Sequence, residues 1–183
     1  TALNCAVIWA TRTATLGVSD SEQKILLLLD AGADINHPDK MGRTPLMSSV
    51  RSGGGAIDEG NRLPVLRLLL DRGADVNLAS RRGRTALMSA AFRGLKETAQ
   101  LLIQSGATID ARDHHGRTAL MNAAEGCFWS YRRAGYIVLI NLLLDLGANP
   151  HLQDHSRLTA LALARRHRRD NLVEIFEKAG VRE

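Results

Sequence analysis

A phrase made of two halves returns five times along this chain, and it constrains the fold more than any other feature. The opening half is a Thr-x-Leu step that begins at Thr1, Thr44, Thr85, Thr118 and Thr159. The closing half is a leucine-rich run that ends at Gly32, Gly73, Gly106, Gly147 and Gly180. Each closing glycine precedes the next threonine of the series by 12 positions, as from Gly32 to Thr44. A junction of constant length predicts a row of stacked structural repeats.

The distance inside a unit, from its threonine to its closing glycine, is not constant. It is 31, 29, 21, 29 and 21 positions in order along the chain. The extra residues lie between the two expected helices of the first, second and fourth units, in segments 11–20, 52–61 and 126–135. Because the junctions keep their length, we expect intact stacking, with the three inserted segments projecting from one edge of the row.

Each unit is predicted to form a hairpin, a helix, a loop and a second helix. A polar stretch with a turn glycine, such as 113–117, favours a tight hairpin tip. The threonine that follows offers its hydroxyl to an unpaired amide at a helix start. The closing glycine suits the left-handed backbone that ends a helix. One unit cannot bury its apolar face alone, whereas stacked neighbours can.

With these features the chain resembles the ankyrin repeat family. The family phrase Asp-x-x-Gly-x-Thr-Pro-Leu is matched at 39–46, and Leu-Leu-x-x-Gly-Ala-Asp-x-Asn at 69–77. The resemblance implies an all-α repeat protein with short β-hairpin loops, an ankyrin-type solenoid of helix-turn-helix units. It implies one domain over residues 1–183, with repeats at about 1–36, 37–77, 78–110, 111–151 and 152–183. Since the first unit lacks a hairpin, we expect further sequence before Thr1.

The chain departs from the family phrase at a few positions. Methionine replaces the family's histidine at Met47, Met88 and Met121, so packing is expected to replace that histidine's hydrogen bonds. Ser80 stands where the other hairpins carry aspartate, and the last hairpin has Arg157 where the others have glycine.

The resemblance also implies where a partner binds. In this family the hairpin tips and the exposed C-terminal part of each first helix form a concave groove. The matching residues are Lys40, Met41, Arg43, Arg51, Arg81, Arg82, Arg84, Phe92, Arg93, His114, His115 and Arg117. Taken singly, each is typical of a solvated tip. As a row they predict a basic groove and an acidic or phosphorylated protein partner.

A second predicted partner-binding cluster lies in segment 126–135 and the residue after it. Together these gather four of the chain's seven aromatic residues beside two arginines. Aromatic and arginine side chains dominate binding hot spots. The residues predicted to bind are Phe128, Trp129, Tyr131, Arg132 and Arg133. The competing interpretation is that Phe128 and Trp129 fold down onto the second helix or a neighbouring insert.

The predicted function is a non-catalytic protein–protein interaction module or scaffold that binds through its groove and its inter-helix insertions. No arrangement typical of a catalytic site stands out, and we expect no cofactor, metal or small-molecule substrate. Four histidines on neighbouring hairpins are more typical of exposed side chains than of zinc ligands. The alternatives are a basic nucleic-acid-binding surface and a regulatory ankyrin domain of a larger enzyme. Nucleic acid is disfavoured because 19 acidic residues are spread among the 24 basic ones.

The cysteines and the apolar runs indicate the expected cellular location of the protein. Cys5 and Cys127 occupy non-equivalent positions, which indicates two thiols rather than a disulfide framework. No apolar run approaches the roughly 20 residues that span a bilayer, so membrane insertion is not expected. The expected location is the cytoplasm, with the nucleus as the alternative.

Overall fold

The computed structural model describes the backbone of residues 1–12, 18–51, 59–129 and 133–181. It describes the side chains of residues 1–11, 22–51, 62–126 and 135–181. Helices account for most of this backbone: α1 Ala2–Arg12, α2 Val18–Asp30, α3 Pro45–Arg51, α4 Glu59–Asp71, α5 Ala86–Arg93, α6 Lys96–Gln104, α7 Ala119–Trp129, α8 Arg133–Asp145, α9 Ala160–Arg166 and α10 Asp170–Lys178.

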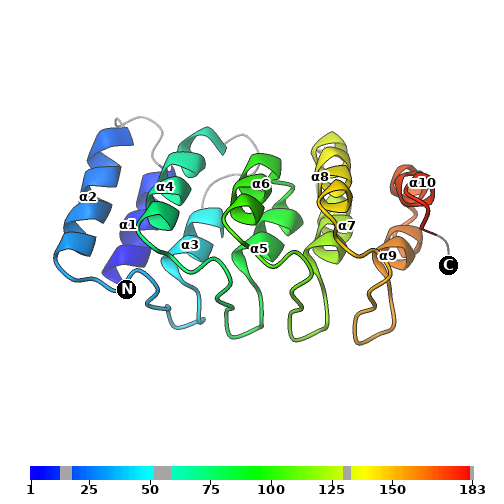
Figure 1. The fold of residues 1–183 in the computed structure, drawn as a ribbon, viewed down its shortest axis with the longest axis horizontal. Helices are drawn as coiled ribbons and strands as arrows, with labels where there is room; N and C mark the ends of the chain where they lie inside the picture. Colours follow the sequence, from blue (N-terminus) through cyan, green and yellow to red (C-terminus); the bar gives the residue numbers. More distant parts are fainter. Residues whose placement is uncertain (13–17, 52–58, 130–132, 182–183) are drawn as a thin grey trace.

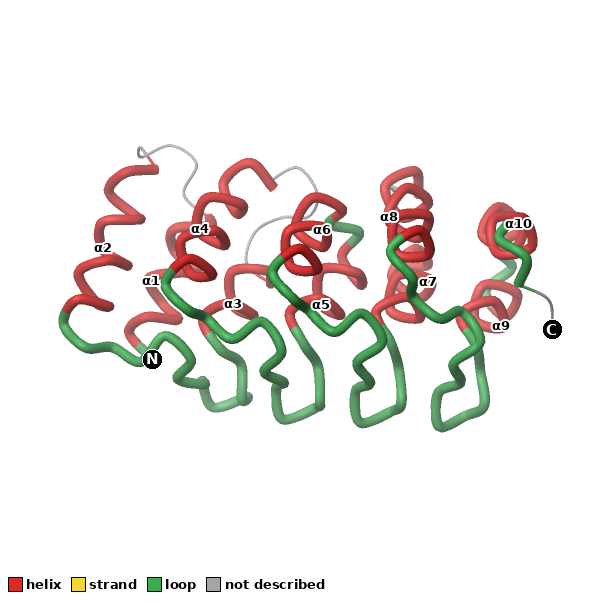
Figure 2. Tube along the Cα trace, in the orientation of Figure 1, coloured by secondary structure: helices red, strands yellow, loops and turns green. Residues whose placement is uncertain are grey.

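The helices stand side by side in an elongated row of five pairs (Figure 1). The odd-numbered helices form one layer and the even-numbered helices the other, so that α5 packs between α3 and α7, and α6 between α4 and α8. The hairpin loops extend from one edge of the row, as the loop segments of Figure 2 show. Among the described residues no strand is formed, so the fold is an all-helical solenoid of repeats.

A ladder of backbone bonds joins the four hairpins, 39–43, 80–84, 113–117 and 154–158. The amide of Arg81 donates to the Met41 carbonyl at 3.1 Å, and the amide of His114 to the Arg82 carbonyl at 3.1 Å. The amide of His155 continues the row to the His115 carbonyl at 2.9 Å. Each hairpin therefore has a fixed position relative to the next.

The predicted helix ends are confirmed. The Thr85 hydroxyl accepts a hydrogen bond from the Met88 amide at 3.3 Å at the start of α5, and Thr159 caps α9 in the same way. The closing glycines take the left-handed backbone, with φ +85° at Gly73 and +90° at Gly106. Arg157 adopts a left-handed φ of 62° where the other hairpins have glycine, and its side chain is exposed.

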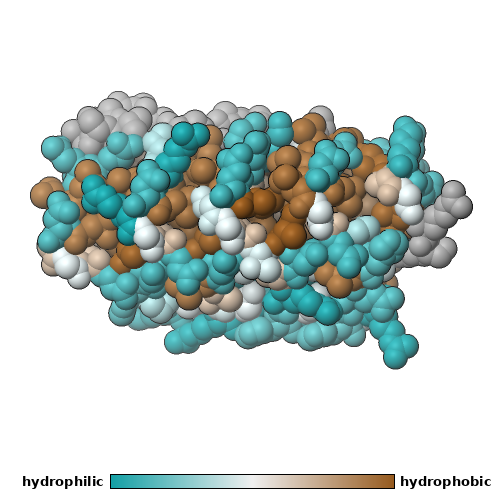
Figure 3. All heavy atoms as spheres, viewed as in Figure 1, coloured by the Kyte–Doolittle hydropathy of each residue, from teal (hydrophilic) through white to brown (hydrophobic). Residues whose placement is uncertain are grey.

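The core is a run of equivalent apolar side chains along the row. Leu46, Leu87 and Leu120 are each 1% exposed, and Leu161 is fully buried. The methionines that replace the family's histidine are buried too, which confirms that they pack. On the face shown in Figure 3, hydrophobic residues lie across the body of the row and hydrophilic residues gather along the hairpin edge. No helix in the described ranges is long and apolar enough to cross a membrane.

The inserted segments are more helical than predicted. Segment 126–135 was expected to be a loop, yet α7 continues to Trp129 and α8 begins at Arg133. Likewise α2 and α4 have 13 residues each, against 9 in α6. The extension of α7 past the end of α5 depends on Gly126, because a Cβ there would lie 2.1 Å from the Phe92 carbonyl oxygen. A residue without a side chain lets the two helices approach this closely.

Candidate functional site

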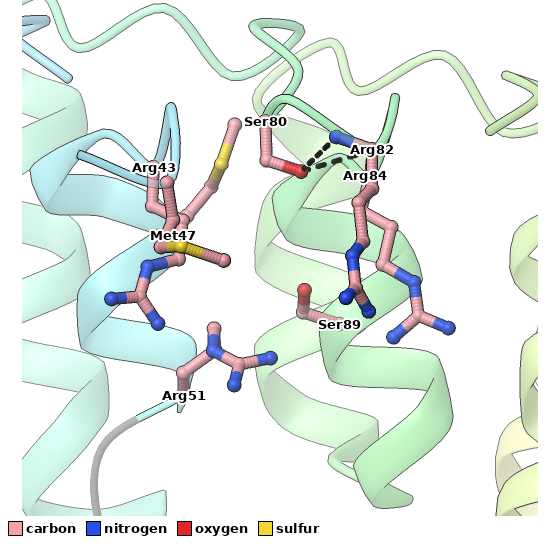
Figure 4. A pocket seen from close by; sticks show the side chains of 8 residues that line it. Arg43, Met47, Arg51, Ser80, Arg82, Arg84 and Ser89 are labelled. Atoms are coloured by element: carbon pink, nitrogen blue, oxygen red, sulfur yellow. Dashed lines mark hydrogen bonds between the residues drawn. The ribbon is translucent and has the colours of Figure 1, made fainter. Parts of the chain in front are cut away.

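A basic pocket opens in the groove where hairpins 39–43 and 80–84 meet helices α3 and α5. Its cavity is about 140 Å³. Four arginines, two methionines and two serines line it: Met41, Arg43, Met47, Arg51, Ser80, Arg82, Arg84 and Ser89 (Figure 4).

Adjacent repeats contribute opposite walls of the pocket. Arg51 is the last residue of α3, one helical turn after Met47, so both lie on the same face of that helix. Figure 4 shows the Arg51 side chain extending toward Ser89 on α5. The side chains of Arg82 and Arg84 run beside each other from hairpin 80–84. The hairpin ladder and the helix stacking therefore bring together arginines that are more than thirty positions apart.

In two hairpins, the arginine after the turn glycine lies beside a carboxylate of the next hairpin. In hairpin 80–84 the arginine after the turn glycine is Arg84, whose Nε lies 3.8 Å from Oδ2 of Asp113 on the next hairpin. In the same way Arg117 Nε lies 3.7 Å from Asp154 Oδ2. Both aspartates are buried, at 5% and 6% exposed. Hairpins 113–117 and 154–158 thus each supply an acid to the arginine of the hairpin before.

Ser80 interrupts this pattern. It occupies the position of Asp113 and Asp154, so Arg43 meets no carboxylate on the following hairpin. The Arg43 guanidinium turns back to its own hairpin, where Nη2 lies 2.6 Å from Asp39 Oδ2. The junction between hairpins 39–43 and 80–84 therefore lacks the carboxylate that the following hairpin supplies at the later junctions.

Ser80 nevertheless preserves the shape of its turn. Its Oγ accepts hydrogen bonds from the amides of Arg82 and Arg84 at 3.4 and 3.3 Å. Asp113 accepts the equivalent bonds from His115 and Arg117 at 2.9 and 3.0 Å. The substitution removes a charge from the groove and leaves the hairpin geometry in place.

The arginines of the groove act on one another. Burial lowers the pKa of Arg51, and the positive charges of Arg43, Arg84 and Arg93 lower it further against a smaller opposing effect of Asp39. Burial also lowers the pKa of Arg93, with Tyr136 acting in the opposite direction. In the described part of the chain, neither Arg51 nor Arg82 has a carboxylate within ion-pair distance. The pocket therefore carries a net positive charge, which favours the binding of an anion.

Phe92 contacts Arg84, one of the arginines that line the pocket. The Arg84 guanidinium lies over its ring, 5.6 Å from the ring centre. The Phe92 carbonyl accepts a hydrogen bond from the Tyr136 hydroxyl at 2.9 Å. Phe92 thus orients Arg84, and Arg93 acts on Arg51 through its charge.

The predicted tip residues Arg81, His114 and His115 do not line the pocket. A Cβ at Gly42 would lie 2.9 Å from Arg81 Cγ, and one at Gly83 would lie 2.7 Å from His114 Cδ2. These two side chains therefore pack on the turn glycine of the preceding hairpin, although both residues are exposed. His115 is exposed at its tip. Across the described ranges, no group of three or more His, Cys, Asp or Glu side chains is placed to hold a metal ion.

The predicted aromatic cluster is only partly covered by the structure. Tyr131 and Arg132 lie outside the described residues, as do the side chains of Phe128, Trp129 and Arg133, so their role in binding stays a prediction. The tyrosine that follows the segment has a packing role. Tyr136 is 4% exposed, and its ring lies within 3 Å of where Cβ atoms would stand at Gly94 and Gly126.

Three pocket residues were not predicted as site residues. Met47 and Ser89 lie on the buried sides of α3 and α5, where sequence alone indicates core. Ser80 carried a signal in the sequence, because it departs from the aspartate of the other hairpins. Its effect on the charge of the pocket follows from the stacking of the hairpins, which places Ser80 opposite Arg43.

Comparison with known proteins gives matches to family models. A model of ankyrin repeats in three copies matches residues 54–133, and a model of a single ankyrin repeat matches residues 115–155. Together the two matches span residues 54–155, which is more than half of the chain and includes hairpin 80–84 and α5. The search of curated proteins gives no match.

Proposed function

Because this chain belongs to the ankyrin repeat family, whose members are generally protein–protein interaction modules and typically non-catalytic, we propose that it binds an acidic segment of another protein. The segment would lie in the groove between hairpins 39–43 and 80–84. The observation that carries the proposal is Ser80, because a serine at a carboxylate position leaves the pocket arginines with an excess of positive charge.

The walls of the pocket also suit a peptide. Met41 is half exposed at its rim, and the buried Met47 forms part of its lining. Methionine side chains adapt their shape to a ligand. Acidic side chains would pair with the arginines while adjacent apolar groups of the partner contact the methionines.

A nucleic-acid partner is less well supported, because the basic surface is interrupted after hairpin 80–84. Arg117 Nη1 lies 2.5 Å from Glu125 Oε2, and Arg117 also faces Asp154. Binding along a nucleic acid needs a continuous series of phosphate contacts. One isolated basic pocket suits a short acidic segment instead.

The test is a binding titration with a fluorescent nine-residue peptide that has glutamates on both sides of a central serine. We expect binding at low salt that weakens as salt rises. The double variant Arg51→Gln/Arg82→Gln should lose most of this affinity. The matched control is Arg67→Gln/Arg72→Gln, which removes the same charge from exposed positions on α4 and just after it, in the other helical layer.

Arg84 and Arg81 are left intact in this design. A change at Arg84 would disturb its contact with the buried Asp113, and a change at Arg81 would disturb packing on Gly42. Circular dichroism should show the same helix content for both double variants. Equal loss of affinity in both would mean that binding follows net charge and not the pocket, and the proposal would be wrong.

A further inference from the structure

We propose that the pocket takes a phosphoryl group, carried on a phosphorylated serine or threonine of the partner segment. This inference rests on the proposed function, because it names the anion that the bound segment presents. The pocket lined by Arg43, Arg51, Arg82 and Arg84 is its site.

The charge of the pocket matches a dianion better than a single carboxylate. Among the side chains that the structure describes, two carboxylates lie within 4 Å of its four arginines: Asp39 beside Arg43, and Asp113 beside Arg84. Four positive charges less two negative ones leave an excess of two. A phosphoryl group carries about −1.5 to −2 at neutral pH, whereas a glutamate carries one negative charge. A phosphoryl group therefore neutralises this excess and a glutamate leaves half of it.

The donors of the pocket suit a tetrahedral anion. Arg51 approaches from α3, and Arg82 and Arg84 approach from hairpin 80–84, on the other side of the cavity (Figure 4). Guanidinium groups bind phosphate oxygens through paired N–H donors. Ser80 Oγ already accepts two backbone bonds, so its O–H is left to donate toward a ligand. An aspartate in this place would repel the same anion.

The cavity has room for such a group together with water. Its volume of about 140 Å³ is well above the roughly 10–15 Å³ that one water requires. The repulsion among the arginines also favours occupation, because burial and neighbouring charges already lower the pKa of Arg51. An anion at this position relieves that repulsion.

The test uses three peptides that differ only at the central residue of the glutamate-flanked sequence: serine, phosphoserine or glutamate. We expect the phosphoserine peptide to bind about tenfold more tightly than the glutamate peptide, a factor that one additional charge-assisted hydrogen bond provides. In amide NMR spectra, the signals of Arg82, Arg84 and Ser89 should move most. Arg51→Gln/Arg82→Gln should remove the preference for phosphoserine, and Arg67→Gln/Arg72→Gln should retain it.

The possible results separate this inference from the proposed function. If the phosphoserine and glutamate peptides bind equally and both depend on Arg51 and Arg82, the phosphoryl inference is wrong and acidic binding stands. If no peptide binds, both are wrong. If a thymidine oligonucleotide of equal charge binds more tightly than the phosphoserine peptide, with the same dependence on Arg51 and Arg82, a nucleic-acid partner replaces both.

Discussion

Arg51 is the residue at which the proposed binding is expected to oppose folding stability. Its position at the end of α3 aims a guanidinium into the groove among three other arginines. Such positions are typical of binding sites, where charge is concentrated for a ligand at some cost to the free protein. Met47, one turn earlier, contributes packing to the same face of α3.

Arg51→Gln is therefore expected to stabilise the free protein slightly. The lowered pKa means that folding disfavours the charged form of Arg51, and this cost is present in full at every pH below the lowered pKa of the folded state. It is thus constant between about pH 5 and pH 9. Because Arg51 is only partly covered and water screens its charge, we expect a gain in unfolding free energy of about 0.5 kcal/mol or less. Urea denaturation measures it, and a clear loss of stability would contradict the repulsion described at this site.

Asp39 is expected to make the unfolding free energy of the protein depend on pH in the acidic range. Burial alone would raise its pKa, but the Arg43 guanidinium and the amides of Arg43 and Met41 donate to the carboxylate and lower its pKa overall. Because the pKa of Asp39 is lower in the folded protein, its ionised carboxylate stabilises the fold. This contribution is present above the unfolded-state pKa near 3.8 and is lost as pH falls through the folded-state pKa.

Asp39→Asn should lower the unfolding free energy by about 0.5–1.5 kcal/mol at neutral pH. The difference from the wild type should shrink as the pH falls below about 4. Urea unfolding between pH 3 and pH 7 measures both curves. Curves that remain parallel down to pH 3 would show that the carboxylate charge contributes nothing.

At the scale of the elements, the helix ends that recur in every repeat could be predicted from the sequence. The features that occur in only one repeat could not. The cap at Thr85 and the left-handed Gly106 follow from local backbone chemistry, so a short motif was enough to predict them. The extension of α7 depends on contact between Gly126 and the Phe92 carbonyl, which are distant in sequence. The net charge of the pocket depends on which carboxylate pairs with Arg43. That pairing follows only from the stacking of hairpins 39–43 and 80–84.

The contact between α5 and α7 allows a paired test within one segment. Gly126→Ala places a methyl group against the Phe92 carbonyl, where backbone must shift, and we expect a loss of about 1–3 kcal/mol in unfolding free energy. Gly135→Ala is the control, because its Cβ would have 3.8 Å to the nearest atom, Gly94 O, and alanine favours the helix by up to about 1 kcal/mol. Thermal unfolding of the two variants measures the difference. Equal stabilities would show that the close approach of the helices is not needed.

At the scale of the whole molecule, the hairpins form one continuous ladder with a single break in its charge pattern among the four described. Asp113 and Asp154 each place a carboxylate beside an arginine of the hairpin before, whereas Ser80 offers Arg43 no carboxylate. The solenoid therefore presents a regular frame in which one junction differs electrostatically from the others. Binding is expected at that junction, because the frame holds its side chains in place before the partner arrives.

Restoring the missing carboxylate tests this idea most directly. Ser80→Asp should keep the turn, because Asp113 makes the same backbone hydrogen bonds, and should not lower the unfolding free energy. It should weaken binding of the phosphoserine peptide at least about tenfold, since it both removes a donor and adds a negative charge. Arg67→Gln is the control for a change of one charge and should bind as the wild type does. Unchanged affinity in a correctly folded Ser80→Asp protein would contradict the role given to this junction.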